Sequence, residues 1–362
     1  MSQRRITLRG WQSWTHCKHG PTFIKRIRNH SPFPYDDVVV TIPEDKKSKS
    51  PITGWCSWNS FMLQVSEQGI LTVVDWLVKR KKDIPVEYIL IDDGWCEWGD
   101  WVTPKRKTFP DGIHGTAKKI REKGFKTGLW LAPFLASEHS NLVKEKPEWF
   151  CRKRFGRWVE GRKNYRLDRL VPGRKYLLDF ENPEVFEYIL QSIRKIVQEW
   201  GITLLKLDFL YAGHFNPKYR TGEQADAKLQ ELLRAIKAMS PELQIIACGC
   251  PLAPAVGLVD AMRISDDVIL PPLKRVPVIN WLVHSIRLRQ LQDNFQARKE
   301  TNVLWNIDPD MFVCHPSYGL SHLQRKKFQA VIKQANGVMM LGDYLPELSE
   351  EEIATYLIPL FR

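Results

Sequence analysis

Short apolar segments alternate with longer amphipathic segments from about residue 51 to the end of the chain. The short segments are rich in Val, Ile and Leu and predict buried strands, whereas apolar residues three or four positions apart predict helices. This alternation indicates a parallel sheet whose helices connect successive strands. Eight strands are predicted, one beginning at Gly54 (GWCSW) and the others at 86–91, 126–131, 203–207, 244–248, 261–264, 302–305 and 337–341.

The segments between these strands carry signals for helix boundaries. Asn182 followed by Pro183 is typical of a helix start, because Asn caps the first turn and Pro fits its first position. This helix is expected to reach Trp200 and to end at Gly201. Further helices are predicted from Ser66 to Lys81 and at 222–239, 276–296, 321–335 and 349–356.

The count of eight strands with intervening helices predicts an α/β fold of the (β/α)8 TIM-barrel type. An open doubly wound sheet is the alternative, but no Gly-rich phosphate-binding turn follows the first strand. Two regions fall outside the repeat: residues 1–50, a short N-terminal extension, and residues 134–180, a long loop after the third strand. We therefore expect a catalytic barrel over residues 51–362, with an insertion at 134–180.

Composition narrows the class of protein. A hydrophobic fraction of 43% in 362 residues is enough for a large core. Apolar runs are too short to span a bilayer, and the opening MSQRRITLRGWQSW lacks the apolar centre of a secretory signal. Seven cysteines form an odd, scattered set without a disulfide framework. We expect a cytoplasmic protein with no membrane partner.

The net charge of +13 is concentrated in one segment. Between Arg152 and Lys175 ten Lys and Arg residues face two acidic ones, a local charge of +8. This segment is interpreted as a solvated basic loop, and a nucleic-acid partner is not expected. Binding of an anionic polysaccharide stays open as an alternative.

Carboxylates follow several predicted strands, where a barrel of this kind carries its catalytic groups. Asp92 and Asp93 end the second strand, Asp208 the fourth and Asp267 the sixth, and the seventh runs into Asp308-Pro-Asp310. The carboxyl ends of the strands meet at one mouth, so these side chains are expected to converge there. A single carboxylate on a loop is commonly a solvated surface residue. Carboxylates at the ends of several strands instead favour a functional site.

Lys206 and Asp208 are two residues apart on one strand and are expected to point to the same side. A neighbouring ammonium favours the ionised carboxylate, which suits a nucleophile. Asp267 would supply a second, proton-carrying carboxyl. Two carboxyls about 5–5.5 Å apart give retention of sugar configuration, whereas a wider pair gives inversion. A structural ion pair between Lys206 and Asp208 is the alternative.

Fourteen tryptophans lie mainly beside acidic residues rather than at helical spacing, as at Trp55 and Trp95. An indole face covers the C–H face of a sugar ring, although core packing explains several of them. No His-x-x-x-His or Cys-x-x-Cys metal set and no Gly-x-Ser-x-Gly nucleophile elbow is present. Neither a metal nor a cofactor is expected.

Six motifs, in order, resemble the α-galactosidases of glycoside hydrolase family 36, the melibiase group of clan D. The similarity runs from about Gly54 to Tyr344. The motifs are GWCSWNSF (54–61), IDDGW (91–95), KTGLWLAPF (126–134), LKLDF (205–209), MRISDD (262–267) and WNIDPD (305–310).

The resemblance implies a role for each matching residue. Asp208 matches the nucleophile, and Asp267 the general acid/base, preferred to Asp266 because it lies four residues after Arg263. Asp92 and Asp93 match the pair that holds the galactose hydroxyls at C4 and C6. The remaining implied substrate contacts are Trp130, Lys206, Cys248, Gly249 and Arg263.

Members of this family usually carry a β-sandwich before the barrel. The GWQSW stretch at 10–14 resembles the part of that domain which supplies a tryptophan to the site, so residues 1–50 are interpreted as the remnant of a β domain. Trp11 and Trp14 are the candidates for this tryptophan, and Trp55, on the first strand, is a further expected substrate contact. A homo-oligomer, in which a neighbouring subunit covers the site, is an open alternative.

The expected activity is retaining hydrolysis of terminal α-galactose from oligosaccharides or glycosides. Two alternatives keep the same machinery, an α-galactosyl transferase and an α-N-acetylgalactosaminidase. A third is a barrel that only binds polysaccharide.

Overall fold

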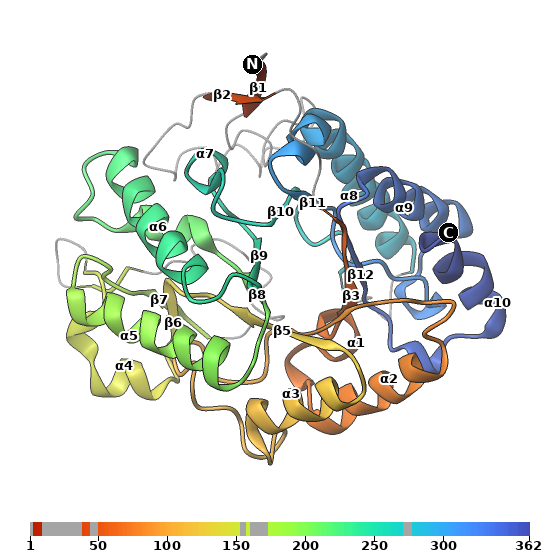
Figure 1. Ribbon diagram of the computed structural model, residues 1–362, viewed down its shortest axis with the longest axis horizontal. Coiled ribbons are helices and arrows are strands. Elements are labelled where there is room, and N and C mark those ends of the chain that lie inside the picture. Colours follow the sequence, from red (N-terminus) through yellow and green to blue (C-terminus); the bar gives the residue numbers. More distant parts are fainter. Residues whose placement is uncertain (1–2, 9–37, 44–49, 153–156, 160–172, 271–276) are drawn as a thin grey trace.

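The computed structural model describes residues 3–8, 38–43, 50–152, 157–159, 173–270 and 277–362. Its centre is a sheet of eight strands in the order β11-β10-β9-β8-β5-β4-β3-β12, in which every registered pair is parallel. This arrangement confirms the predicted (β/α)8 barrel (Figure 1). The strands are β3 (Ile52–Cys56), β4 (Tyr88–Ile91), β5 (Lys126–Leu131), β8 (Leu204–Leu207), β9 (Gln244–Ala247), β10 (Ala261–Arg263), β11 (Asn306–Asp308) and β12 (Val338–Leu341).

The sheet is nearly closed by the chain just beyond β11. Phe312 bridges to Leu341 in the parallel sense. The Phe312 N–H donates to the Met340 carbonyl (2.7 Å), and the Gly342 N–H donates to the Phe312 carbonyl (2.8 Å). The segment before β12 must pass close to β11, since a Cβ on Gly337 would lie 2.5 Å from the Ile307 carbonyl oxygen. Glycine at 337 therefore permits the last strand to approach its neighbour.

The longer helices surround the strands as an outer ring (Figure 1). Three begin at the polar residue expected of a cap: Ser66 accepts from the Gly69 N–H, Asn182 from Glu184, and Ser321 from Gln324. The helices are α1 (Trp58–Phe61), α2 (Glu67–Lys79), α3 (Gly112–Glu122), α4 (Asn141–Glu145), α5 (Pro183–Arg194), α6 (Gly222–Lys237), α7 (Leu252–Ala255), α8 (Pro277–Arg298), α9 (His322–Ala335) and α10 (Glu350–Glu352).

Strand residues alternate between the barrel interior and the helix layer, as a period of two requires. One buried cluster fills the interior, with Cys56, Leu90, Leu204, Ile246 and Met340 among its members. The residues next to these in sequence belong to a second, larger cluster that includes the helices; it contains Trp55, Ile89, Ile91, Leu205, Ala247 and Leu341. This parity decides which strand-end side chains can reach the mouth.

The prediction for the seventh strand was wrong by four residues. Residues 302–305 were expected to form it, but Lys299–Val303 is a 3-10 helix and β11 starts at Asn306. Leu304 and Trp305 are buried without being in a strand, and the Trp305 indole N–H donates to Thr301 Oγ1 at 3.2 Å. The apolar run that indicated a strand therefore packs as a buried turn. Between β9 and β10 only the short α7 occurs, so that connection lacks a full helix.

Both regions outside the repeat contain strands. In the extension, β1 (Gln3–Leu8) pairs antiparallel with β2 (Val38–Pro43). In the long loop, β6 (Leu135–Ser137) pairs antiparallel with β7 (Lys175–Leu177). The domain boundaries at 50 and at 134–180 stay predictions. None of the helices in the described residues has the length and apolar character needed to cross a membrane.

Candidate functional site

The inward positions become polar at the carboxyl ends of the strands. The barrel interior is apolar lower down, at Ile52, Tyr88, Leu204 and Ile246. Two to four residues further along these strands, and at the ends of β5, β10 and β11, the side chains are thiol, carboxylate, indole, ammonium or guanidinium. This set of mouth residues comprises Cys56, Asp92, Trp130, Lys206, Asp208, Cys248, Arg263 and Asp308.

Asp92 and Lys206 form a buried ion pair across the mouth. Lys206 Nζ lies 2.7 Å from Asp92 Oδ2, and the Cys56 thiol donates to the same oxygen at 3.2 Å. Burial of Lys206 opposes its charge more than any single neighbour favours it, but Asp92, Cys56 and Cys248 together hold the lysine pKa well above its ordinary value. The Asp92 N–H donates to Ser57 Oγ at 2.9 Å. The Asp92 carboxyl is therefore held by the Lys206 ammonium and the Cys56 thiol, and its backbone by Ser57.

Asp93 presents an oxygen that is buried and unpaired within the described part of the chain. Its Oδ1 accepts from the Gly94 N–H (2.7 Å) and from Trp98 Nε1 (2.8 Å), while Oδ2 has no partner there. Burial raises the pKa of Asp93 from 3.8 to about 7, although Trp98 and Lys175 favour the ionised form. Lys175, from β7, places its ammonium 5.0 Å from the centre of the Trp98 ring. An unpaired buried acceptor of this kind suits a ligand hydroxyl.

Asp208 is held by donors on both of its oxygens. Oδ1 accepts from the Phe209 N–H at 2.7 Å, and Oδ2 accepts from Trp130 Nε1 at 3.2 Å. Phe209 has a left-handed backbone (φ 53°), which turns the chain directly after the strand. Burial raises the pKa of Asp208; Lys206 lowers it, and the nearby charge of Asp267 raises it further. The charge of Lys206 acts as expected from the sequence, but burial outweighs it.

Arg263, at the end of β10, forms ion pairs with three carboxylates. Its Nη2 lies 3.3 Å from Asp267 Oδ1 and its Nη1 lies 3.3 Å from Asp308 Oδ2. It also forms an ion pair with Asp310. The Asp267 side chain is 52% exposed, whereas those of Arg263, Asp308 and Asp310 are buried. Asp267 is therefore the half-exposed carboxyl of this group, and its charge acts on the buried Asp208.

Cys248 and Gly249 follow β9 as the sequence indicated. Cys248 is buried, and its burial together with the charge of Asp208 raises the thiol pKa, so the thiol stays neutral. Gly249 has φ +55°, and a Cβ there would lie 2.9 Å from the Tyr211 ring. Both residues therefore lie on the barrel wall beside Asp208.

Trp55 lies in the helix layer and not at the mouth. It was expected to contact substrate, but it is fully buried and its indole N–H donates to the Asp343 carbonyl at 2.9 Å. Position 55 faces the helix layer, whereas position 56 faces the interior, so Cys56 is the residue of β3 that reaches the mouth. Trp11 and Trp14 lie outside the described residues.

Three residues around the mouth were missed, Cys56, Trp98 and Lys175, whereas Asp308 and Asp310 were expected at the mouth but were given no role. Strand parity could have identified Cys56, and the strand-end motif already contained Asp308 and Asp310. Lys175 had no such signal, since it closes the basic segment and reaches the site only through the pairing of β7 with β6.

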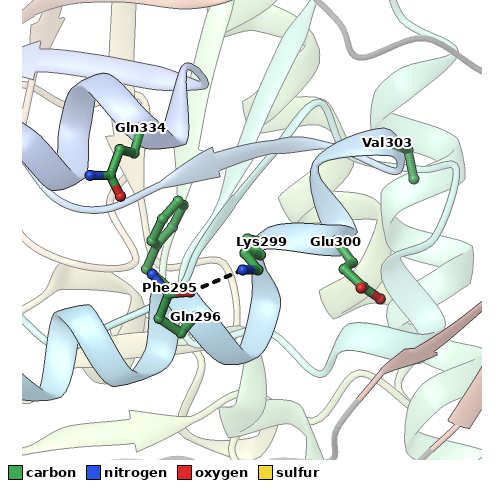
Figure 2. A pocket seen from close by; sticks show the side chains of 6 residues that line it. All are labelled: Phe295, Gln296, Lys299, Glu300, Val303 and Gln334. Carbon is green, nitrogen blue, oxygen red and sulfur yellow. Dashed lines mark hydrogen bonds between the residues drawn. The ribbon is translucent and has the colours of Figure 1, made fainter.

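Within the described residues, no group of three or more His, Cys, Asp or Glu side chains could hold a metal ion. The six cysteines described are free thiols. A separate hollow lies where α8 leads toward β11, at the amino end of that strand (Figure 2). Lys299 there donates to Gln296 at 3.1 Å, and the hollow shares no residue with the mouth.

Several known α-galactosidases are similar to this chain. The Melibiase family model matches residues 45–244. Alpha-galactosidase AgaA of Geobacillus stearothermophilus is 26% identical over 160 residues, and alpha-galactosidase Mel36A of Lactobacillus acidophilus is 31% identical over 161 residues; each match covers 42% of this chain. In both cases the match spans only 20% of the relative's length.

Among solved structures, the α-galactosidase TtGalA of Thermus thermophilus, in complex with p-nitrophenyl α-D-galactopyranoside, superposes with a TM-score of 0.73 at 27% identity. The superposition covers 90% of this chain and 67% of that one. The family 36 enzyme AgaA superposes with a TM-score of 0.61 at 18% identity, over 87% of this chain and 42% of that one, which supports the fold. Since the Melibiase model covers more than half of the residues, the chain belongs to the Melibiase family.

Proposed function

We propose that the protein is an α-galactosidase that removes terminal α-linked galactose from oligosaccharides or glycosides. The observation that carries the proposal is the group of carboxylates at the mouth, where Asp92 lies beside Lys206, and Asp267 and Asp308 lie beside Arg263. The names of the relatives and the galactoside bound in the Thermus enzyme support the same substrate class.

Galactose recognition is assigned to Asp92 and Asp93. Charged acceptors that bind a hydroxyl discriminate strongly between sugars differing in that hydroxyl, because a mismatch leaves a buried charge unpaired. Asp93 Oδ2 is buried and available for this purpose. Lys206 and Arg263 would donate to other ring hydroxyls, and Trp130 would cover one face of the ring.

The reaction we propose is a double displacement with retention of configuration. Asp208 attacks the anomeric carbon, the bond to the leaving oxygen breaks, and Asp267 gives its proton to that oxygen. Asp267 then takes a proton from water, the water oxygen attacks the anomeric carbon, and the ester to Asp208 breaks. The half-exposed position of Asp267 supports its exchange of protons with water, and the donors from Trp130 and Phe209 hold Asp208 in place.

Two observations support Asp267 rather than Asp266 as the acid/base. Asp267 Oδ1 lies 3.3 Å from Arg263 Nη2, and its charge acts on Asp208. The hydrogen bond from Arg263 and the electrostatic effect on Asp208 both favour an Asp267 carboxyl that faces the mouth.

The test is turnover of p-nitrophenyl α-galactoside, with the α-glucoside and the N-acetyl-α-galactosaminide as comparison substrates. We expect the galactoside alone to be cleaved, and Asp208→Asn to reduce the rate by at least about 10⁴-fold, because the nucleophile is lost. An unchanged rate in Asp208→Asn would sink the assignment. Faster turnover of the acetamido sugar would make the protein an α-N-acetylgalactosaminidase, and galactosylated products with added sucrose would make it a transferase.

We also assign the protein to the cytoplasm. Support comes from its thiols, because the six cysteines described are all free. Free thiols persist in reducing compartments.

A further inference from the structure

Asp310, directly after β11, has an unusual backbone and a buried carboxylate. Its φ is +90°, which residues other than glycine rarely adopt, and only 3% of its side chain is exposed. Its own N–H donates to Asp308 Oδ1 at 3.0 Å. A strained residue persists only where its surroundings fix it, and such residues gather at functional sites.

The Asp310 carboxylate contacts two separate parts of the chain around Asp267. Oδ2 accepts from the N–H of Val268, the residue after Asp267, at 2.7 Å. Oδ1 accepts from the Met311 N–H at 2.7 Å and from the Arg263 guanidinium. The same nitrogen of Arg263 lies 3.3 Å from Asp267 Oδ1. One buried carboxylate thus holds the backbone next to Asp267 and also the partner of its side chain.

We propose that Asp310 is a positioning residue, which fixes the direction of the Asp267 carboxyl for proton transfer. The inference rests on the proposed function, in which Asp267 is the general acid/base. A general acid acts only within hydrogen-bond reach of the leaving oxygen, and a displacement of about 1 Å can reduce the rate about 100-fold. Asp267 is half exposed, and besides these two attachments only the Arg287 guanidinium, which donates to the Asp267 backbone carbonyl, is seen to hold it within the described residues.

The proposal predicts an effect that depends on the leaving group. A 2,4-dinitrophenyl group leaves as a stable anion and needs no proton, whereas methanol leaves only after protonation. Loss of Asp267 positioning should therefore slow cleavage of methyl α-galactoside and spare cleavage of the dinitrophenyl galactoside. A general loss of stability would slow both by the same factor.

The variants are Asp310→Asn, which removes the charge at nearly constant shape, and Asp310→Gly. Glycine adopts a φ of +90° without strain, so the second variant removes the carboxylate while relieving the backbone. The matched control is Asp343→Asn. Asp343 is fully buried after β12 and accepts the N–H groups of Cys314 (2.8 Å) and His315 (3.0 Å). Burial raises the pKa of Asp310 and that of Asp343 alike, each to about 6.

We expect kcat/KM of both Asp310 variants to fall about 10- to 100-fold on methyl α-galactoside and at most about threefold on the dinitrophenyl galactoside. Asp343→Asn should change kcat/KM on both substrates by the same factor. Equal losses on the two substrates in the Asp310 variants would overturn the proposal.

Hydrogen exchange measured by mass spectrometry gives a readout that does not depend on activity. The peptide spanning 264–270 should exchange faster in Asp310→Gly than in wild type and stay unchanged in Asp343→Asn. Unchanged exchange in Asp310→Gly would overturn the positioning role. If the wild-type protein cleaves neither substrate, the proposed function fails, and the exchange result alone decides whether Asp310 holds the segment next to Asp267.

Discussion

The carboxylates at the mouth differ in how well the fold itself stabilises their charge. Asp92 has an ammonium at 2.7 Å, whereas Asp93 has two neutral N–H donors on one oxygen and none within the described residues on the other. A buried charge without a close partner costs free energy. Under the proposed role of Asp93 in galactose binding, ligand binding and the stability of the free protein are in conflict at this position.

This conflict predicts a pH-dependent gain in stability for Asp93→Asn. The pKa of Asp93 is raised from 3.8 to about 7, so folding takes up a proton between about pH 4 and pH 7. The free energy of unfolding therefore falls as pH rises through that window and stays reduced above it. Asn keeps the acceptor for Gly94 and Trp98. We expect Asp93→Asn to be more stable than wild type at pH 8 by up to about 4 kcal/mol, and by much less at pH 5.

Urea unfolding at the two pH values measures the difference. Asp75→Asn, at an exposed carboxylate on α2, is the control and should show no such trend. A stability difference for Asp93→Asn that does not change between pH 5 and pH 8 would contradict the account. The same variant should also lose turnover of α-galactosides.

At the scale of elements, strand parity and strand ends account for most of the site. Alternation along β4, β8 and β10 brings Asp92, Lys206 and Arg263 to the mouth, as expected from the sequence. The same alternation turns Trp55 into the helix layer, where an apolar, aromatic residue is stabilised by packing. Lys175 could not be predicted, because its place depends on the pairing of β7 with β6, two short strands separated by a long segment.

Closure of the sheet predicts a large effect at Gly337. In Gly337→Ala the added Cβ would lie 2.5 Å from the Ile307 carbonyl oxygen and 2.6 Å from the Ile307 nitrogen, so β12 must move away from β11. Such overpacking typically costs about 1–3 kcal/mol, and backbone atoms cannot rotate aside. We expect a loss of at least about 2 kcal/mol in the free energy of unfolding.

Gly257→Ala is the comparison for this variant. A Cβ at Gly257 meets no atom within 4 Å, but its φ of +79° adds backbone strain of about 1 kcal/mol. Chemical denaturation of both variants separates a steric clash from strain. If Gly337→Ala lowers the free energy of unfolding no more than Gly257→Ala does, then closure of the sheet tolerates a side chain at position 337.

At the scale of the whole molecule, the number of strands and the order of the strand-end motifs were predictable. Each strand is short and apolar and is followed by a polar residue. The seventh strand was misplaced because the apolar residues before it are buried in a turn rather than in a strand. The matched segment is a fifth of the length of the curated relatives, yet the mouth residues named here come from the barrel and its long loop. We therefore infer that the barrel carries the chemistry.

The most direct test of this account is the anomer formed first from an α-galactoside, observed by proton NMR before mutarotation. Two carboxyls that act by double displacement through Asp208 release the α-anomer, and Asp208→Asn should release neither anomer at a measurable rate. First appearance of the β-anomer would mean that water attacks directly, and would contradict the role of Asp208 as nucleophile.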